Sequence, residues 1–300
     1  MGRSFAGRYE DETVTVEIVG AGTVGEATGI VLEEWGNEVV FKDIDEKVRK
    51  LLRNRGYRAR KPSAEVGATL SLVCVPTPFD EGVGLSTDYV ESAIRTLAEQ
   101  DPEVVAVRST VPPGTTRQLA ETYGIEDYAV LPEFLFEDTA QEDVERSEVM
   151  VLGSDSAKAP EVIKRTFEPN VTGFIEIRPV EAELVKLVGN TFAATKISFA
   201  NGMWRIADSL SSADPDVVLS AFRQVSPWMG PDMGLEGGWP YGGHCLPKDT
   251  RGLKQWMEET TGGAPPQLKG TIRENEQMRR SDYDSADVNT GTAESVHMDN

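Results

Sequence analysis

The sequence predicts an α/β protein in which a doubly wound parallel sheet is followed by an all-helical domain with one long helix. Two observations predict this fold class. Short apolar runs alternate with helical stretches over residues 13–177, which is typical of βαβ units and a mostly parallel sheet. From residue 178, apolar residues recur at helical spacing for more than 30 residues without a strand signal. That pattern predicts one helix more than twice the usual length.

The expected elements follow in chain order. A buried strand at 14–19 precedes a helix over 23–35, which ends at Gly36. Further strands are expected at 37–41, 70–75, 104–107, 128–131 and 149–152. After the long helix, Asp214 and Pro215 predict the N-cap and first turn of a shorter helix.

The chain is therefore expected to divide into a sheet domain over residues 13–177 and a helical domain over 178–280. Two polar ends flank these domains. Residues 1–12 are expected to be flexible, and residues 281–300 form an acidic segment with few large apolar groups, which predicts disorder.

Charge and composition exclude several functions. The formal net charge is -20, and the acids are spread along the chain. This negative field argues against nucleic acid and anionic membranes as partners, and a salt-loving host would explain it because salt screens self-repulsion. No apolar run is long enough to span a membrane, the N-terminus lacks the apolar core of a signal peptide, and two cysteines form no disulfide framework. We expect a cytoplasmic protein without a metal site.

The segment "GAGTVG" places glycines at positions 20, 22 and 25, after the first strand and at the start of the first helix. In a Rossmann-like fold, these glycines allow a tight turn, close approach of a pyrophosphate, and contact between helix and strand. Asp43 ends the next strand, where a carboxylate accepts ribose hydroxyls and repels a 2′-phosphate. The pattern predicts NAD as the cofactor, and the alternative is a structural turn beside a surface acid.

The two cysteines have different surroundings. Cys74 lies inside an apolar strand, as expected of a small buried hydrophobe. Cys245 follows the flexible pair Gly242 and Gly243 and precedes Pro247, a favoured first helical residue. Because a helix N-terminus stabilises a thiolate, Cys245 is a candidate nucleophile.

Five stretches carry a family resemblance. They are "VCVPTP" (73–78), "RSTVPPGTT" (108–116), "LPEFLFEDTA" (131–140), "ELVKLVGNTFAATKISFANG" (183–202) and "GGHCLPKDTRGL" (242–253). In this order, together with the glycine turn, they resemble the UDP-glucose/GDP-mannose dehydrogenase family from about residue 14 to about residue 280. That family oxidises the primary alcohol of a nucleotide sugar to a carboxylate with two NAD per turnover.

The resemblance implies that Cys245 forms a thiohemiacetal with the sugar aldehyde and then a thioester, which water hydrolyses. It implies that Lys186 and Asn190 meet the oxygen of the reacting carbon, and that Asp249 and Thr110 hold the catalytic water. Glu133 corresponds to the proposed base for hydrolysis and Glu137 to an acid beside the sugar. From the residues alone, both glutamates could equally belong to a solvated surface, and the alternative for Lys186 is an ordinary surface lysine.

The remaining implied contacts are with cofactor and substrate. The residues expected to hold NAD are Gly20, Gly22, Thr23, Val24, Gly25, Asp43, Pro76, Thr77, Thr110 and Lys248. The residues expected to hold the nucleotide sugar are Phe134, Leu135, Glu137, Lys186, Asn190, Tyr241 and Gly242.

The sequence departs from the family at three places. His244 replaces the usual serine before the cysteine, and Gly202 stands where relatives often carry an acid. Residues 281–300 offer no strands for the family's third domain, which closes over the nucleotide, so we expect that domain to be missing. The sequence does not identify the sugar.

Three hypotheses follow. The chain is an active four-electron nucleotide-sugar dehydrogenase, a two-electron dehydrogenase of a smaller sugar or hydroxy acid, or a non-catalytic NAD-binding subunit that needs a partner chain. The long helix has apolar residues on more than one face, as a buried helix does, and in the family it forms a dimer core. We therefore expect a homodimer through the helical domain; the alternative is burial within one chain.

Overall fold

The computed structural model forms two compact units, Met1–Val188 and Gly189–Asn300. The structure describes residues 13–168, 170–208, 210–225, 238–260 and 262–280. The expected flexible N-terminus, 1–12, and the expected acidic tail, 281–300, lie outside the described residues. The boundary at Val188 falls inside the long helix, eleven residues beyond the end of the sheet domain expected from the sequence.

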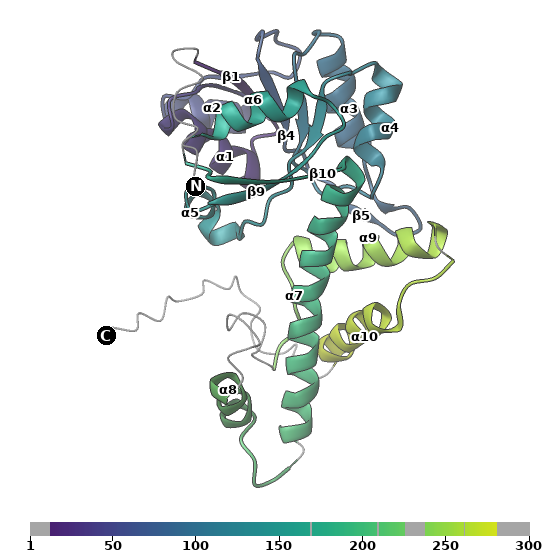
Figure 1. Ribbon diagram of the computed structural model, residues 1–300. Helices are drawn as coiled ribbons and strands as arrows, with labels where there is room; N and C mark the ends of the chain where they lie inside the picture. Colours follow the sequence, from purple (N-terminus) through teal and green to yellow (C-terminus); the bar gives the residue numbers. More distant parts are fainter. Residues whose placement is uncertain (1–12, 169, 209, 226–237, 261, 281–300) are drawn as a thin grey trace, which may run out of the picture. The chain divides into compact units, whose positions relative to one another are not determined.

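The first unit contains an eight-stranded sheet with the order β10-β9-β8-β7-β4-β1-β2-β3 (Figure 1). The strands are β1 (Thr15–Val19), β2 (Glu38–Lys42), β3 (Ala59–Arg60), β4 (Leu70–Val73), β7 (Val105–Val107), β8 (Tyr128–Val130), β9 (Val149–Gly153) and β10 (Gly173–Ile177). Six of them are parallel, whereas β9 pairs antiparallel with β8. The order reverses between β1 and β4, which is the point where open α/β sheets bind ligands. The predicted Rossmann-like parallel sheet is confirmed.

Helices cover both faces of this sheet (Figure 1). One apolar cluster joins the sheet to α1 (Thr23–Glu34), α2 (Glu46–Asn54) and α6 (Lys158–Phe167). A second cluster on the other face joins it to α3 (Asp88–Ala98) and α4 (Thr115–Tyr123). Burial on both faces explains why the central strands are continuous apolar runs.

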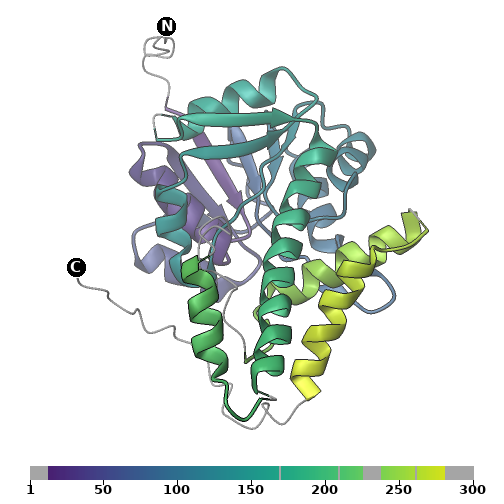
Figure 2. The same ribbon diagram turned by 60° about the horizontal axis from the view of Figure 1, so that its bottom comes forward.

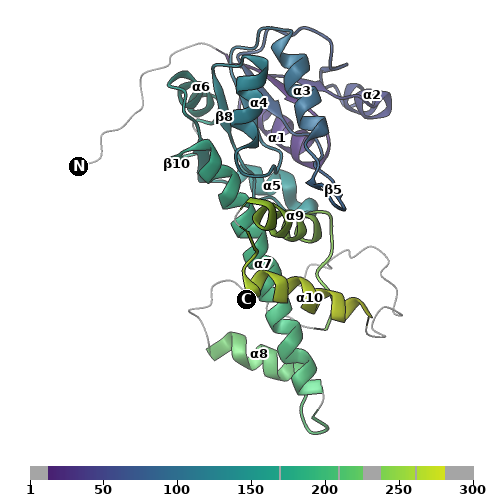
Figure 3. The ribbon, with the colours of Figure 1, turned by 90° about the vertical axis from the view of Figure 1, so that its right-hand side faces the viewer.

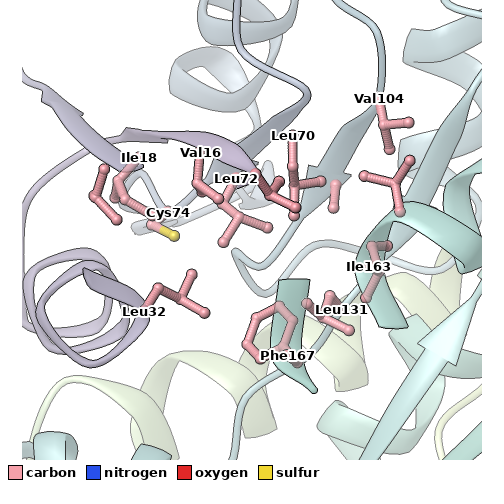
Figure 4. Packing of buried hydrophobic residues seen from close by; sticks show 14 of the residues in the cluster. Val16, Ile18, Leu32, Leu70, Leu72, Cys74, Val104, Leu131, Ile163 and Phe167 are labelled. Carbon is pink, nitrogen blue, oxygen red and sulfur yellow. The ribbon is translucent and has the colours of Figure 1, made fainter. Parts of the chain in front are cut away.

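The core of the first cluster lies around the middle strands (Figure 4). Ile18 is fully buried and is paired in register with Phe41 on one side and Leu72 on the other. Leu32 from α1 packs into the same cluster, as does the side chain of Cys74 at the end of β4. This packing fixes the carboxyl ends of β1 and β4, where the glycine turn begins.

Some elements were not expected from the sequence. They are the two-residue strand β3, the hairpin of β5 (Phe79–Asp80) and β6 (Gly84–Leu85), the edge strand β10 and the helix α5 (Ala140–Glu145), which follows the short 3-10 helix η1 (Glu137–Thr139). These elements are short or, in β10, mostly half-exposed to exposed, so they lack a continuous apolar signal.

Every described element after β10 is a helix, as expected. The long helix α7 (Pro179–Asp208) has 30 residues and begins at a proline, a favoured first position. Next comes α8 (Pro215–Val225), and the Asp214 side chain accepts hydrogen bonds from the amides of Asp216 and Val217, as the predicted N-cap requires. The last two helices are α9 (Cys245–Thr260) and α10 (Pro266–Arg280) (Figure 2).

Within the second unit, α10 packs across α7 (Figure 3). The Ser198 hydroxyl donates to the Thr271 carbonyl at 3.1 Å, and Arg205 forms an ion pair with Glu274. These contacts fix α10 against the half of α7 that follows Val188.

Candidate active site

The glycine turn after β1 has the geometry that the sequence predicted. Gly20 has a φ of +95°, and a Cβ at this position would lie 2.8 Å from the carbonyl oxygen of Cys74. A Cβ at Gly25 would lie 1.9 Å from the carbonyl oxygen of Gly20. Glycine is therefore required at the first position by the turn and at the third by the packing of α1 on the turn.

Gly22 is different, because nothing in the protein requires it to be glycine. Its φ is -75°, it is exposed, and no protein atom lies within 4 Å of a Cβ built there. It is the N-cap of α1 and provides no side-chain cap, which leaves the amides of the first turn, where Thr23 and Val24 lie, open to a ligand. An open cradle of this kind fits the pyrophosphate of a dinucleotide.

Asp43 follows β2 and lies beside this turn. Its Oδ2 atom accepts a hydrogen bond from the Ala21 amide at 2.9 Å, and its Oδ1 atom accepts one from the Asp45 amide at 2.7 Å. These bonds fix the carboxylate next to the first turn of α1. Each oxygen retains a second lone pair, so the group can still accept ribose hydroxyls.

The loops after β4 and β7 form the other side of the sheet's carboxyl edge. The Ser109 hydroxyl donates to the carbonyl oxygen of Val75 at 2.7 Å and ties the two loops together. Pro76 is exposed, Thr77 is buried and Thr110 is half-buried. The three residues expected to line the cofactor thus lie on two tied loops beyond the strand ends.

A buried ion pair joins Glu133 to Lys186. The Lys186 Nζ atom lies 3.0 Å from Oε1 of Glu133, and both side chains are less than one-tenth exposed. The second carboxylate oxygen of Glu133 accepts the Leu135 amide at 2.7 Å, and Lys186 also lies over the Phe134 ring, 5.4 Å from its centroid. Neither charged group belongs to a solvated surface.

Glu137 has a different environment from Glu133, although the two are four residues apart. It begins the 3-10 helix η1 and is exposed. Phe134 is 47% exposed and Leu135 is half-buried. The segment 133–137 therefore presents one buried acid, one exposed acid and two exposed aromatic rings, Phe134 and Phe136.

Two buried charged residues beside these groups were not singled out from the sequence. The Glu183 carboxylate accepts the amides of Gly114 and Thr116 at the start of α4, and burial raises its pKa. It ties the first turns of α7 to the loop that carries Thr110. Arg108 follows β7, is 4% exposed and donates to the Leu131 carbonyl at 3.4 Å. Both residues lie in stretches that carry the family resemblance, Arg108 in 108–116 and Glu183 in 183–202, and their charge within those stretches was the feature that could have singled them out.

Asn190 lies one turn beyond Lys186 on α7, in the second unit. Its amide donates to Oδ2 of Asp249, and the Lys248 ammonium lies 2.6 Å from Oδ1 of the same carboxylate. Asp249 is fully buried. The structure thus brings two of the predicted residues, Asn190 and Lys248, to the buried carboxylate of a third.

Cys245 is the first residue of α9, so the helix begins two residues before the expected start at Pro247. The cysteine is exposed. Gly243 has a φ of +70°, a left-handed conformation that glycine favours. Gly242 and His244 are exposed, while Tyr241 is buried. Cys245 and Asp249 lie four positions apart on one face of α9.

Two buried asparagines hold the loop before Cys245, and neither was predicted. The Asn201 side chain donates to the Trp239 carbonyl at 2.8 Å and accepts the Gly238 amide at 3.0 Å. Asn275 of α10 donates to the Tyr241 carbonyl at 3.1 Å. The chain on the approach to the cysteine is therefore fixed from both α7 and α10.

Cys74 matches its expected role as a buried apolar residue. It is 8% exposed, and burial raises the pKa of its thiol to about 12. Among the described residues, the structure shows no cluster of histidine, cysteine and acidic side chains that could hold a metal ion. None of the described helices has the length and apolar character needed to cross a membrane.

Two family models match this chain. The NAD binding domain of the UDP-glucose/GDP-mannose dehydrogenase family matches residues 57–171, and the central domain of the same family matches residues 180–277. The UDP-glucose 6-dehydrogenase TuaD of Bacillus subtilis is 29% identical over 88% of this chain, which spans 63% of the length of TuaD. A GDP-mannose 6-dehydrogenase of Pseudomonas syringae is 28% identical over 90% of this chain and 69% of its own length.

Two solved structures are similar to this chain, one from the same family and one that shares only the fold. A UDP-glucose dehydrogenase from Pyrobaculum islandicum superposes with a TM-score of 0.80 and 27% identity, over 91% of this chain and 70% of that protein. The 3-hydroxyisobutyrate dehydrogenase of Mycobacterium tuberculosis, at 14% identity and a TM-score of 0.68, shares the fold over 90% of this chain and 95% of its own length. The first comparison points to the family, and the second shows the fold alone.

Proposed function

Because the chain belongs to the UDP-glucose/GDP-mannose dehydrogenase family and has its NAD-binding domain, we propose that it oxidises the 6-hydroxymethyl group of a nucleotide sugar to a carboxylate. The observation that carries this proposal is the position of Cys245. It is exposed at the first residue of a helix, and one turn further along the buried Asp249 is held by Asn190 and Lys248.

NAD, when bound, accepts a hydride in each of the two oxidations. The glycine turn would hold its pyrophosphate and Asp43 its ribose hydroxyls, while Pro76, Thr77 and Thr110 would line its other end. Lys248 is also proposed to contact the cofactor.

The chemistry proposed for the chain's own groups is covalent. The Cys245 Sγ atom adds to the sugar aldehyde to form a thiohemiacetal, which loses a hydride and a proton to become a thioester. Water then attacks the thioester carbon, the carbon–sulfur bond breaks, and the carboxylate and the free thiol are released. A helix N-terminus favours the thiolate that begins this sequence.

The other site residues are proposed to handle charge and protons. Lys186 stabilises the oxyanion on the reacting carbon, and Asn190 donates to the same oxygen. Asp249 and Thr110 hold the water, and Glu133 takes its proton. The substrate contacts are assigned to Phe134, Leu135, Glu137, Tyr241 and Gly242.

We further propose a homodimer formed through α7. In the second unit, Phe192, Phe199, Met203 and Ile206 follow each other at helical spacing and are 36–62% exposed. An apolar stripe of this kind marks a protein contact. Light scattering at high salt should give the mass of a dimer, and Phe192→Ser should shift it toward the monomer, whereas a strictly monomeric wild type would refute the dimer.

The experiment is NADH production at high salt, with a panel of UDP- and GDP-sugars. Wild type should form two NADH for each sugar consumed, Cys245→Ala should form none beyond the first oxidation, and Cys74→Ala is the matched control. High salt is used because the net charge of -20 favours a salt-loving host.

One other function is supported by an observation. The fold shared with a hydroxyacid dehydrogenase of about the same length suits a two-electron oxidation of a smaller substrate. That reaction needs no nucleophile, so full activity of Cys245→Ala with one NADH per substrate would favour it. NAD binding without turnover of any sugar would instead point to a subunit that needs a partner chain.

A further inference from the structure

One segment of the first unit has a charge opposite to that of the rest of the chain. Residues 46–61, "EKVRKLLRNRGYRARK", contain eight of the 30 basic residues and one of the 50 acids, a local charge of +7. The remaining residues have 22 basic and 49 acidic side chains, a charge of -27. An isolated positive region in a negative field concentrates small anions locally.

This segment forms a cavity at the edge of the sheet, between α2 and the edge strand β3. Its volume is about 460 Å³. The lining side chains are five cations, one carboxylate, one phenol and one methyl group: Arg49, Arg53, Arg58, Arg60, Lys61, Glu46, Tyr57 and Ala59. The lining thus has a net charge of +4.

Three of the lining arginines are already oriented, and Arg58 is one of them, because it donates to the Val39 carbonyl at 3.2 Å and pairs with Glu38. The Glu46 carboxylate pairs with both Arg49 and Arg53, and Arg53 also donates to the Ala59 carbonyl at 3.3 Å. Arg60 and Lys61 are exposed and form no salt bridge with any residue in the described part of the chain. The cavity therefore combines three fixed guanidinium groups with two cations that are available to an anion.

We propose that this cavity binds a compact anion with more than one phosphate charge. Guanidinium groups present paired N–H donors in a fixed fork that matches two phosphate oxygens. A net lining charge of +4 is best neutralised by a multiply charged ligand. Long polyanions are disfavoured because the surface beyond the segment is negative, whereas a small anion contacts only the positive lining.

Two sources can supply this phosphate chemistry. The cavity adjoins the ribose end of the cofactor site, because Arg49 donates to the Asp43 carbonyl oxygen and the Asp43 amide donates to the Arg60 carbonyl at 3.3 Å. The phosphate could therefore be the 2′-phosphate of NADP or a free polyphosphate. The Asp43 carboxylate beside the ribose repels a 2′-phosphate, so the geometry favours the free anion. The site lies within the first unit and does not depend on the proposed reaction.

The test is a calorimetric titration of the full chain with sodium tripolyphosphate at fixed ionic strength. Wild type should bind, and the Arg60→Gln/Lys61→Gln variant should bind about tenfold or more weakly, since it loses charge-assisted hydrogen bonds. The matched control, Lys47→Gln/Lys50→Gln, removes two exposed charges of α2 outside the lining and should stay within about twofold. Glu46→Gln should tighten binding because it removes the only acid of the lining.

Titrations with NAD and NADP distinguish the sources. Tripolyphosphate binding that persists with saturating NAD, with NADP no better than NAD, identifies a free polyphosphate. NADP binding that competes with tripolyphosphate and is lost selectively in the Arg60/Lys61 variant identifies the 2′-phosphate. Wild type that binds neither tripolyphosphate nor NADP, or an equal loss in the control variant, would overturn the proposal.

Discussion

The two cysteines occupy regions that differ in solvent exposure and in backbone structure. Cys74 lies at the end of a central strand, is 8% exposed, and its pKa is raised to about 12 by burial. Cys245 is exposed and is the first residue of α9, directly after a loop held by Asn201 and Asn275. The comparison teaches that a reactive thiol needs an exposed sulfur on a fixed backbone, and that the sheet core provides neither exposure nor a stabilised thiolate.

The largest expected difference between the two regions is in turnover. Cys245→Ala should lower the rate of carboxylate formation about a thousandfold or more, because it removes the covalent step. Cys74→Ala should retain near wild-type turnover, since the side chain only packs in the core. An equal loss of turnover in both variants, at equal folded fractions by circular dichroism, would contradict the assignment of different roles to the two cysteines.

Labelling with iodoacetamide should show the next difference. In the native protein at neutral pH, Cys245 should be alkylated about a hundredfold or more faster than Cys74, which reacts only when the structure opens. Peptide mass spectrometry of partially labelled protein measures both rates. The difference should vanish in denaturant, and native labelling of Cys74 at a comparable rate would contradict its burial.

Much of this contrast could be predicted from the sequence, and some of it could not. The apolar run around Cys74 predicts a strand, and the glycines and Pro247 around Cys245 predict a helix start, which lies two residues earlier in the structure. The partners of the charged residues could not be predicted from the sequence, because Glu133 and Lys186 are 53 positions apart and only the folded chain brings them together. Tertiary contacts of this kind leave no periodic signal.

The same limit applies to the supports of the site. Nothing in the spacing of Asn201 indicates that it fixes the loop before Tyr241, and a charged residue such as Glu183 looks like part of a solvated helix face. The two-residue strand β3 was missed because it is too short for an alternating pattern. Local signals identified the main elements, whereas long-range hydrogen bonds determined their detailed positions.

The glycine turn beside Cys74 allows a smaller effect to be measured. Gly25→Ala should destabilise the fold by about 2 kcal/mol or more, because its Cβ would overlap the Gly20 carbonyl. Gly22→Ala should change the free energy of unfolding by no more than about 0.5 kcal/mol, because its Cβ meets no protein atom. Both variants should lose NAD affinity in a fluorescence titration, and full NAD affinity in Gly22→Ala would contradict the assignment of this turn to the pyrophosphate.

The last expected difference is in the pH dependence of stability. The pKa of Cys74 in the folded protein, about 12, is above its value of about 8.5 in the unfolded chain. The stability that the buried neutral thiol contributes is therefore fully present below about pH 8.5 and is lost as the pH rises toward 12. The free energy of unfolding of the wild type should therefore fall by up to about 1.4 kcal/mol per pH unit more than that of Cys74→Ala in this window. Urea unfolding of both proteins from about pH 8 to pH 10 measures the difference, and parallel curves would show that the thiol is not buried.

The most direct test of the covalent account is to identify the adduct. Wild type and Glu133→Gln are mixed with NAD and the best sugar of the panel, quenched in acid during turnover, and digested for peptide mass spectrometry. The account predicts a sugar acyl group on the peptide that contains Cys245, absent from the Cys74 peptide, and more abundant in Glu133→Gln because hydrolysis is slowed. Carboxylate product formed at full rate without any adduct on Cys245 in either protein would contradict it.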